Sequence, residues 1–355
     1  LDNGFIYFGL EGTWFNSGDP TSGATGTGAA FSSVAPATGS PNLIPAIAPD
    51  NGDTYTINFG ASSYTHTIPT GYKALNTSNL GSPAIADPTS SFHPQLYTGN
   101  GSTQSIDLNG NSTFEPAFTI IKNRDEDDSW VWTDAVRGAT KIISSDTAAA
   151  EATDADTLTA FESDGFALGD DDKVNTNTEK YVSYNWKANG SGSADSDGMT
   201  KTSDSSTSSI TVSADATAGF SIIKYTGNGS ASTLAHGLGK APSFIITKDL
   251  GNSRAWPVYH QGLSAATKVI YMNTYVPEAT DAAIYGAAPT SSVVNIATSD
   301  ESNGNTISYI MYAFAEIDGF SKFGTYTGNG ANDGPFINLG FKPALFAVKA
   351  RGLNA

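Results

Sequence analysis

The pentapeptide YTGNG occurs three times in this sequence, at residues 97–101, 225–229 and 326–330. Behind each copy, further residues recur at nearly constant distances from its tyrosine. A proline follows by 19, 17 and 17 positions, a lysine by 25, 23 and 23, and a tryptophan behind the first two copies by 33 and 31. These residues are Pro116, Pro242 and Pro343, Lys122, Lys248 and Lys349, and Trp130 and Trp256. Agreement at several positions predicts an internal repeat of about 100 residues.

The segments between these positions are short, rich in β-branched and aromatic residues, and bounded by Gly, Asn, Asp, Ser or Pro. Examples are FTIIKNR, FSIIKYTG, SFIITKD and ISYIMYAFAEI. Patterns of this kind are typical of strands, and long helical periodicity is missing. We therefore expect an all-β chain of tandem β-sandwich domains, concanavalin-like or jelly-roll-like, with short helical insertions near residues 147–158 and 277–286.

The repeat divides the chain into five predicted parts. Residues 1–82 do not match the repeat and form a different unit. Residues 83–190 and 219–319 are the first two repeats, and residues 191–218, which are rich in Ser and Asp, are expected to be a linker or spacer ending in a strand. Residues 320–355 begin a third repeat and stop after about a third of its length. Together with the first residue, Leu1, this predicts that the sequence is a piece of a longer chain.

Composition and charge narrow the function classes. The 355 residues include 35 acidic and 18 basic side chains, a net charge of −17, and no basic stripe indicates nucleic-acid binding. No apolar run approaches the roughly 20 residues that cross a bilayer, so membrane insertion is not expected. The chain has no cysteine, which excludes disulfides and thiolate-bound metals.

Two stretches resemble known protein families. Residues 5–20 (FIYFGLEGTWFNSGDP), together with residues 45–49, 56–60 and 71–80, resemble the second half of a SPRY-type, concanavalin-like sandwich. From Leu96 onward, phrases such as LYTGNGSTQSI, DAVRGATK, YVSYNWKANGSG and FAEIDGFSKFGTYTGNG resemble repeats of large structural proteins of marine tailed bacteriophages. The second resemblance covers about three quarters of the chain. It implies a virion tail or fibre-like protein and no defined biochemical activity.

Glycines 99 and 101 and their equivalents suit a tight hairpin turn or bulge, because glycine adopts positive φ without strain. Asn100, Asn228 and Asn329 can serve that turn or present their amides to a ligand. In a repeated unit we favour the structural role. The turn is thus interpreted as the start of a module rather than as a binding site.

Tryptophan side chains are the candidates for stacking on sugar rings. Trp130 and Trp256 occupy equivalent repeat positions beside alternating apolar residues, so we expect both to lie in the core. The other aromatic candidates, whose exposure the sequence leaves open, are Trp14, Tyr72, Trp132, Trp186 and Tyr285.

The acidic runs at residues 125–128 (DEDD) and 170–172 (DDD) can supply oxygen ligands to Ca²⁺, but neither has the spacing of a calcium loop. Solvated loop acids are favoured, with calcium as the alternative. Lys122, Lys248 and Lys349 end apolar strands and are expected to pair with an acid or to protect a strand edge.

No catalytic site is predicted. The sequence gives no reason to pair any two carboxylates as a glycosidase requires, and no catalytic motif is present. The histidines are scattered. The residues considered are Glu115, Glu151, Glu162 and Glu179, and His66, His93, His236 and His260.

The leading hypothesis is therefore a virion surface or tail-associated structural protein that presents repeated β modules for recognition of a host-surface carbohydrate. Its expected partners are other virion proteins, further copies of itself and a surface glycan. One alternative is a purely architectural component, such as a capsid decoration or tail scaffold without ligand. A bacterial cell-surface adhesin is another alternative, and a degradative enzyme is the weakest.

Overall fold

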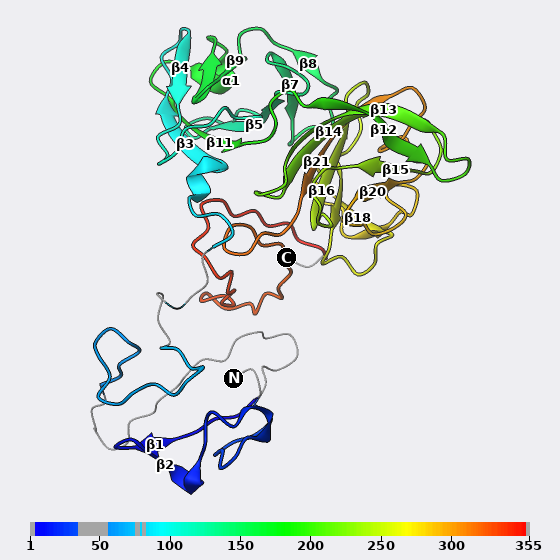
Figure 1. Cartoon of the computed structure of the whole chain (residues 1–355). Coiled ribbons are helices and arrows are strands. Elements are labelled where there is room, and N and C mark those ends of the chain that lie inside the picture. Colours follow the sequence, from blue (N-terminus) through cyan, green and yellow to red (C-terminus); the bar gives the residue numbers. More distant parts are fainter. Residues whose placement is uncertain (1–3, 35–55, 75–78, 80–82, 353–355) are drawn as a thin grey trace. The chain divides into compact units, whose positions relative to one another are not determined.

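The computed structural model describes residues 4–34, 56–74, 79 and 83–352, and the chain divides into two compact units, residues 1–82 and 83–355 (Figure 1). In the first unit, strands β1 (Gly9–Leu10) and β2 (Thr13–Trp14) pair antiparallel, followed by the 3₁₀ turns η1 (Phe15–Ser17) and η2 (Gly23–Thr25). Residues 45–49 and half of residues 71–80, which carry part of the SPRY-like resemblance, lie outside the described residues. That resemblance stays a prediction.

The second unit is almost entirely β, which confirms the predicted fold class of all-β sandwich architecture. The elements of its first half are η4 (Pro88–Ser90), β3 (Phe92–Thr98), β4 (Gln104–Asp107), β5 (Phe118–Asn123), β6 (Val131–Asp134), β7 (Lys141–Ser144), β8 (Ala152–Thr153), β9 (Leu158–Glu162), β10 (Gly165–Leu168), α1 (Asp172–Asn175) and β11 (Lys180–Trp186). Those of its second half are β12 (Ser193–Lys201), β13 (Thr207–Asp215), β14 (Phe220–Thr226), β15 (Ser232–Ala235), β16 (Phe244–Asp249), β17 (Pro257–His260), β18 (Lys268–Tyr271), β19 (Ala279–Thr280), β20 (Val293–Ile296) and β21 (Ser308–Phe314).

The two predicted helical segments are wrong. Residues 147–158 and 277–286 form loops around the short strands β8 and β19, and α1 is the one α-helix among the described residues. The alanines that suggested a helix at residues 147–158 instead belong to a loop that packs against the next repeat. Tertiary contacts override a helix propensity that is worth only tenths of a kcal/mol per residue.

The internal repeat forms two modules with the same strand order, which we call module 1 (residues 92–186) and module 2 (residues 220–314). In module 1 the larger sheet has the order β3-β11-β5-β6-β7-β8, and in module 2 the equivalent strands follow in the order β14-β21-β16-β17-β18-β19. The smaller sheet of module 1 is β4-β10-β9, and its counterpart in module 2 contains β15 and β20. Every strand pair in both modules is antiparallel among the described residues.

The central strands are buried on both faces. In β5, Ile121 faces a core inside module 1, whereas Phe118 and Ile120 face a second core that module 1 shares with module 2. In β21, Tyr309 and its alternate neighbours face the inner core of module 2, while Ile310 and Tyr312 face the shared core. Burial on both faces explains why these strands are apolar at almost every position. The two larger sheets therefore pack face to face, and module 1 and module 2 form one body.

The segment expected to be a linker or spacer, residues 191–218, is built into the sheet, and the strand expected at its end lies within β13. The segment forms the hairpin β12–β13, in which β13 pairs with β14 and β12 pairs with β15. The hairpin thereby joins the two sheets of module 2 into one ten-stranded sheet (Figure 1). Its Ser and Asp residues suggested a spacer, but Met199 and Ile210 are buried in the core of module 2 and fix the hairpin there.

The YTGNG turn has the structural role that the sequence favoured. In module 1, Tyr97 stacks on Tyr181 with ring centroids 5.1 Å apart, and Tyr225 stacks on Tyr309 at 5.2 Å in module 2. A Cβ at Gly99 would lie 2.1 Å from the carbonyl oxygen of Thr176, so only glycine fits that position.

One buried asparagine holds the turn of each of the two modules in place, and no pattern in the sequence indicates it. The side chain of Asn175 accepts from the N–H of Asn100 at 2.9 Å and donates to the carbonyls of Ser102 (2.5 Å) and Gly169 (2.6 Å). Asn303 makes the same bonds in module 2, with the N–H of Asn228 at 2.9 Å and the carbonyls of Ser230 (2.6 Å) and Ala297 (2.7 Å). The third turn, residues 326–330, contains no strand and Tyr326 is half exposed.

Candidate functional site

The four tryptophans of the second unit divide into three core residues and one exposed residue. Trp132, Trp186 and Trp256 belong to the core shared by the two modules. Trp130 was expected to be buried like its equivalent Trp256, but 36% of its surface is exposed, against 0% for Trp256. The reason is tertiary: the indole Nε1 of Trp256 donates to the carbonyl of Thr147 from module 1, and Trp130 has no such covering loop in the described residues.

The remaining aromatic candidates do not form a sugar platform. Tyr285 is buried, and its hydroxyl donates to the carbonyl of Pro257 and shares a hydrogen bond with Thr247. In the first unit, Trp14 packs edge-to-face on Tyr7, and Tyr72 is half exposed. No cluster of exposed aromatic rings thus emerges from the candidates in the described residues.

The acidic runs serve local structure. Asp125 accepts from the N–H of Lys180, Asp128 accepts from the side chain of Asn123, and Asp171 caps α1 and forms an ion pair with Lys173. Within residues 4–34, 56–74 and 83–352, no three His, Asp or Glu side chains are grouped as metal ligands. The geometry therefore adds no support to the calcium alternative.

The histidines and glutamates are not brought together in module 1 and module 2. His260 accepts from the N–H of Gly262, and His236 bonds only to main-chain groups. Glu151 pairs with Arg137, and Glu162 accepts from Ser105. Glu115 is exposed, and Glu179 accepts from the side chain of Asn123.

No described helix has the length and apolarity to cross a membrane.

Lys122 and Lys248 lie at the ends of β5 and β16 as expected, whereas Lys349 lies in no strand, and all three lysines bond to carbonyls instead of acids. Lys248 is fully buried and its Nζ donates to three carbonyls, those of Ala148 at 3.1 Å, Asn252 at 3.3 Å and Arg254 at 3.2 Å. Burial lowers the pKa of Lys248 to about 8, although neighbouring Asp249 opposes the shift. The lysine thereby ties module 2 to module 1.

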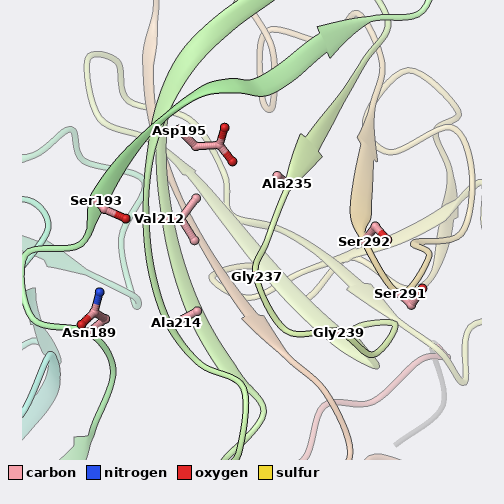
Figure 2. A pocket seen from close by; sticks show the side chains of 10 residues that line it. All are labelled: Asn189, Ser193, Asp195, Val212, Ala214, Ala235, Gly237, Gly239, Ser291 and Ser292. Atoms are coloured by element: carbon pink, nitrogen blue, oxygen red, sulfur yellow. The ribbon is translucent and has the colours of Figure 1, made fainter.

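A groove of about 560 Å³ lies where the hairpin β12–β13 meets the end of β15, and it is the candidate binding site (Figure 2). One wall is polar and comes from Asn189, Ser193 and Asp195. The carboxylate of Asp195 stands at a bulge, where the pairing with β13 shifts register between Asp195 and Met199. Bulges re-aim side chains in this way and often border functional sites.

The rest of the groove is apolar or consists of exposed main chain. Val212, Ala214 and Ala235 pack against the core of module 2 and line the groove with methyl groups. Gly237, at φ +72°, and Gly239, at φ +68°, lie on one loop of its rim, and Ser291 and Ser292 lie on another. The groove contains residues of the hairpin, which has no counterpart in module 1, so only module 2 carries it.

The sequence does not predict a binding site at the groove residues, because the composition of their segment is typical of a spacer. Its polar composition was the signal, since Asp195 and Ser193 lie in the stretch that interrupts the repeat. Their distance in sequence from Ala235 and Ser291 hid the common surface. The pairings of β12 with β15 and of β15 with β20 bring these segments together.

His236 holds the two loops of the groove rim together. It is fully buried; its Nδ1 accepts from the N–H of Leu238 at 3.2 Å, and its Nε2 lies 3.2 Å from the carbonyl of Thr290. These partners suit a neutral ring with the proton on Nε2. Burial lowers the pKa of His236, and the bond to Thr290 opposes the shift.

The stability that this neutral histidine supports should be lost in acid. The unfolded chain binds a proton at pH values below about 6.5, whereas the folded chain resists protonation until a lower pH. Unfolding free energy should therefore fall as pH drops from about 7 to 5, by at most about 1.4 kcal/mol per pH unit from this residue. Urea titrations of the wild type and His236→Gln measure it: the difference between the two should shrink toward acid. A difference that stays constant from pH 8 to 5 would contradict the assignment.

Comparisons with known proteins give one match. A family model described as a domain of unknown function, DUF7483, matches residues 87–354. No curated protein matches the chain, and no solved structure matches it.

Proposed function

We propose that this chain, which belongs to the DUF7483 family of unknown function, is a non-catalytic structural protein that displays a saccharide-binding groove on a rigid β body. The groove of module 2 is the observation that carries the proposal. The proposal that the protein lies on a virion surface or tail is supported by the resemblance of the repeat sequences to those of structural proteins of marine tailed bacteriophages. Other virion proteins and further copies of the chain are the partners that such a place implies.

The chemistry of the groove suits a polyhydroxylated ring. The carboxylate of Asp195 accepts hydrogen bonds from sugar hydroxyls, and the amide of Asn189 both donates and accepts. Val212, Ala214 and Ala235 offer an apolar surface to the C–H face of the ring. A concave site with apolar lining and a few oriented polar groups is the usual form of a small-ligand site.

The rigid body supports weak but multivalent binding. The groove is built on strands of the ten-stranded sheet, and its lining residues Val212, Ala214 and Ala235 also pack against the core of module 2, so its walls keep their positions. A shallow site of this kind binds one sugar weakly. Several copies on one particle raise the overall avidity by orders of magnitude without a stronger single site.

The purely architectural role is the second candidate, and the burial of three tryptophans favours it. Trp132, Trp186 and Trp256 are committed to joining the modules rather than to stacking on a ligand. In that role the two-module body serves as a building block of a larger assembly and binds no ligand. The bacterial adhesin alternative shares the groove and differs only in where the chain is displayed.

A glycan array with the full chain displayed multivalently tests the groove. The chain should retain a saccharide, and Asp195→Ala should weaken retention about tenfold or more, because hydrogen bonds to a charged group contribute about 1.5–3 kcal/mol. Asp204→Ala is the matched control, since Asp204 lies on the same hairpin, caps its own turn through the N–H of Ser206 and does not line the groove. If no glycan is retained, or if both variants behave alike, the architectural role is favoured.

A further inference from the structure

One loop of module 1 covers the lysine strand of module 2. We call residues 147–151 and their equivalents in module 2, residues 274–278, donor loops. The carbonyl of Ala148 accepts from Lys248 at 3.1 Å, the carbonyl of Thr147 accepts from Trp256 at 2.8 Å, and the N–H of Glu151 donates to the carbonyl of Leu250 at 3.0 Å. This contact buries Lys248 and Trp256 completely and Leu250 to 8% exposure. We use the term acceptor for three residues taken together: the lysine, the residue two positions after it and the tryptophan. In module 2 these are Lys248, Leu250 and Trp256.

A related contact occurs between module 2 and the third YTGNG segment, in which the lysine bonds to a carbonyl one residue earlier in the donor loop. The carbonyl of Thr274 accepts from Lys349, and the N–H of Glu278 donates to the carbonyl of Arg351 at 2.9 Å. Arg351 also pairs with the carboxylate of Glu278 at 3.0 Å. Glu278 and Glu151 are equivalent, as are Lys349 and Lys248. The relation is therefore head-to-tail: each donor loop covers the acceptor of the following repeat.

The acceptor of module 1 is uncovered in this chain. Its residues are Lys122, which is partly exposed, Arg124, which is exposed, and Trp130, which is 36% exposed. Their equivalents in module 2 are buried. Lys122 already donates to the carbonyl of Glu126 at 3.0 Å, as Lys248 does to the carbonyls of its own turn. The Lys-x-Arg spacing of Lys122 and Arg124 repeats that of Lys349 and Arg351. A glutamate placed like Glu278 would thus find an arginine at Arg124.

Module 1 and module 2 turn the same sheet face to the shared core, and a residue from the segment that precedes the third YTGNG lies at the edge of that core. Ile120 of module 1 and the equivalent Ile246 of module 2 both belong to that core. The ring of Phe323, from the third segment, stacks on Phe244 at 5.7 Å and lies 6.2 Å from Phe314, two residues that pack against the same core. A head-to-tail contact leaves one acceptor and one donor loop unused unless its rotation closes a ring.

We propose that Lys122, Arg124 and Trp130 bind the donor loop of a further module of this repeat, so that head-to-tail contacts join three modules. The partner is defined by its chemistry: two loop carbonyls for the lysine ammonium and the indole N–H, and a glutamate for Arg124. The contact would combine bonds that the chain already makes: lysine and indole to loop carbonyls, as at Lys248 and Trp256, and arginine to glutamate, as at Arg351. Module 1 would then be covered as module 2 is.

The test extends the full chain by fusing a second copy of residues 252–319 after Gly352, which supplies the rest of a module, including a donor loop. Residue-level labelling by mass spectrometry then reports acylation of Lys122 and oxidation of Trp130. Both should fall about tenfold on extension, while labelling of exposed Lys240 stays the same. Arg124→Glu should restore labelling, and reversing the added copy of Glu278 to Arg should suppress it again. Recovery of shielding by the charge-reversed pair would show that the shielding comes from a specific contact and not from general compaction of the longer chain.

A second fusion guards against an extension that fails to fold. A copy of residues 83–218 placed ahead of Pro83 brings a donor loop to module 1 by the connection that already joins module 1 to module 2. It should shield Lys122 and Trp130 in the same way. The proposal is wrong if neither fusion shields them. It is also wrong if the unextended chain forms dimers in which both residues are shielded and Arg124→Glu breaks those dimers, because the occupant is then a second copy.

Discussion

Asn303→Ala should lower the free energy of unfolding by about 3–5 kcal/mol, measured by urea denaturation of the full chain. The side chain of Asn303 is fully buried and bonds to the N–H of Asn228 and to the carbonyls of Ser230 and Ala297. Its removal leaves three main-chain groups without partners in the protein interior, and each such group costs about 1–3 kcal/mol. The loss should also free the YTGNG turn of module 2 from the loop before β21.

Asn329→Ala is the control for that experiment. Asn329 is the equivalent of Asn228 in the third turn, is exposed, and bonds only to the N–H of Ala331 among the hydrogen bonds of the described residues. Its loss should change stability by less than about 0.5 kcal/mol. Asn303→Asp should be at least as harmful as Asn303→Ala, because it sets a carboxylate oxygen against two carbonyls. Equal stability of Asn303→Ala and Asn329→Ala would refute the role assigned to the buried asparagine.

Arg137→Met should destabilise the fold by about 3–5 kcal/mol and loosen the contact between module 1 and module 2. The Nε of Arg137 lies 2.5 Å from the carboxylate of Asp134, with both side chains fully buried, and the hydroxyl of Tyr312 from module 2 donates to the same carboxylate at 2.7 Å. Burial alone disfavours the charged guanidinium, but the Asp134 carboxylate raises the pKa of Arg137 above its ordinary value. Removing the arginine leaves a buried carboxylate without its counter-charge, which is the costly way to break such a pair.

Two further variants decide whether the charge is the cause. Lys141→Met is the matched control, because Lys141 also approaches Glu151, at 3.9 Å, but is 37% exposed, so its loss should cost at most about 1 kcal/mol. Asp134→Asn combined with Arg137→Met removes both charges and should recover a large part of the lost stability. Thermal unfolding and limited proteolysis provide the readout. If Arg137→Met melts like Lys141→Met, this network does not hold the two modules together.

The repeat and the fold class followed from local patterns. YTGNG has a strict local requirement, since Gly99 and Gly227 approach carbonyls so closely that no Cβ fits, and this requirement is visible wherever the motif recurs. Short β-branched segments between turn residues likewise specify strands without reference to their neighbours. The sequence therefore predicted an all-β chain of repeated modules.

Contacts between modules were beyond local reasoning. Trp130 and Trp256 have the same surroundings in sequence, yet only Trp256 is covered, because the covering loop belongs to the preceding module. The alanines near residue 148 looked helical for the same reason: their partner, Lys248, lies 100 residues away. Propensity carries no information about a contact at that distance.

The groove shows the same limit. Residues 191–218 have the composition of a spacer, and their two strands form because β14 and β15 present edges on which a hairpin can pair. Backbone hydrogen bonds of that kind depend weakly on side chains, so polar strands pass unnoticed in a sequence.

The sequence by itself thus determined the repeat, the strand-rich modules and the structural use of the YTGNG turn, since each depends on backbone conformations that nearby residues impose. Only the tertiary structure decided that the two larger sheets share a core, that Asn175 and Asn303 hold the turns, and that the interrupting segment lines a groove. Those features depend on which surfaces meet, and the packing of residues far apart in the chain sets that.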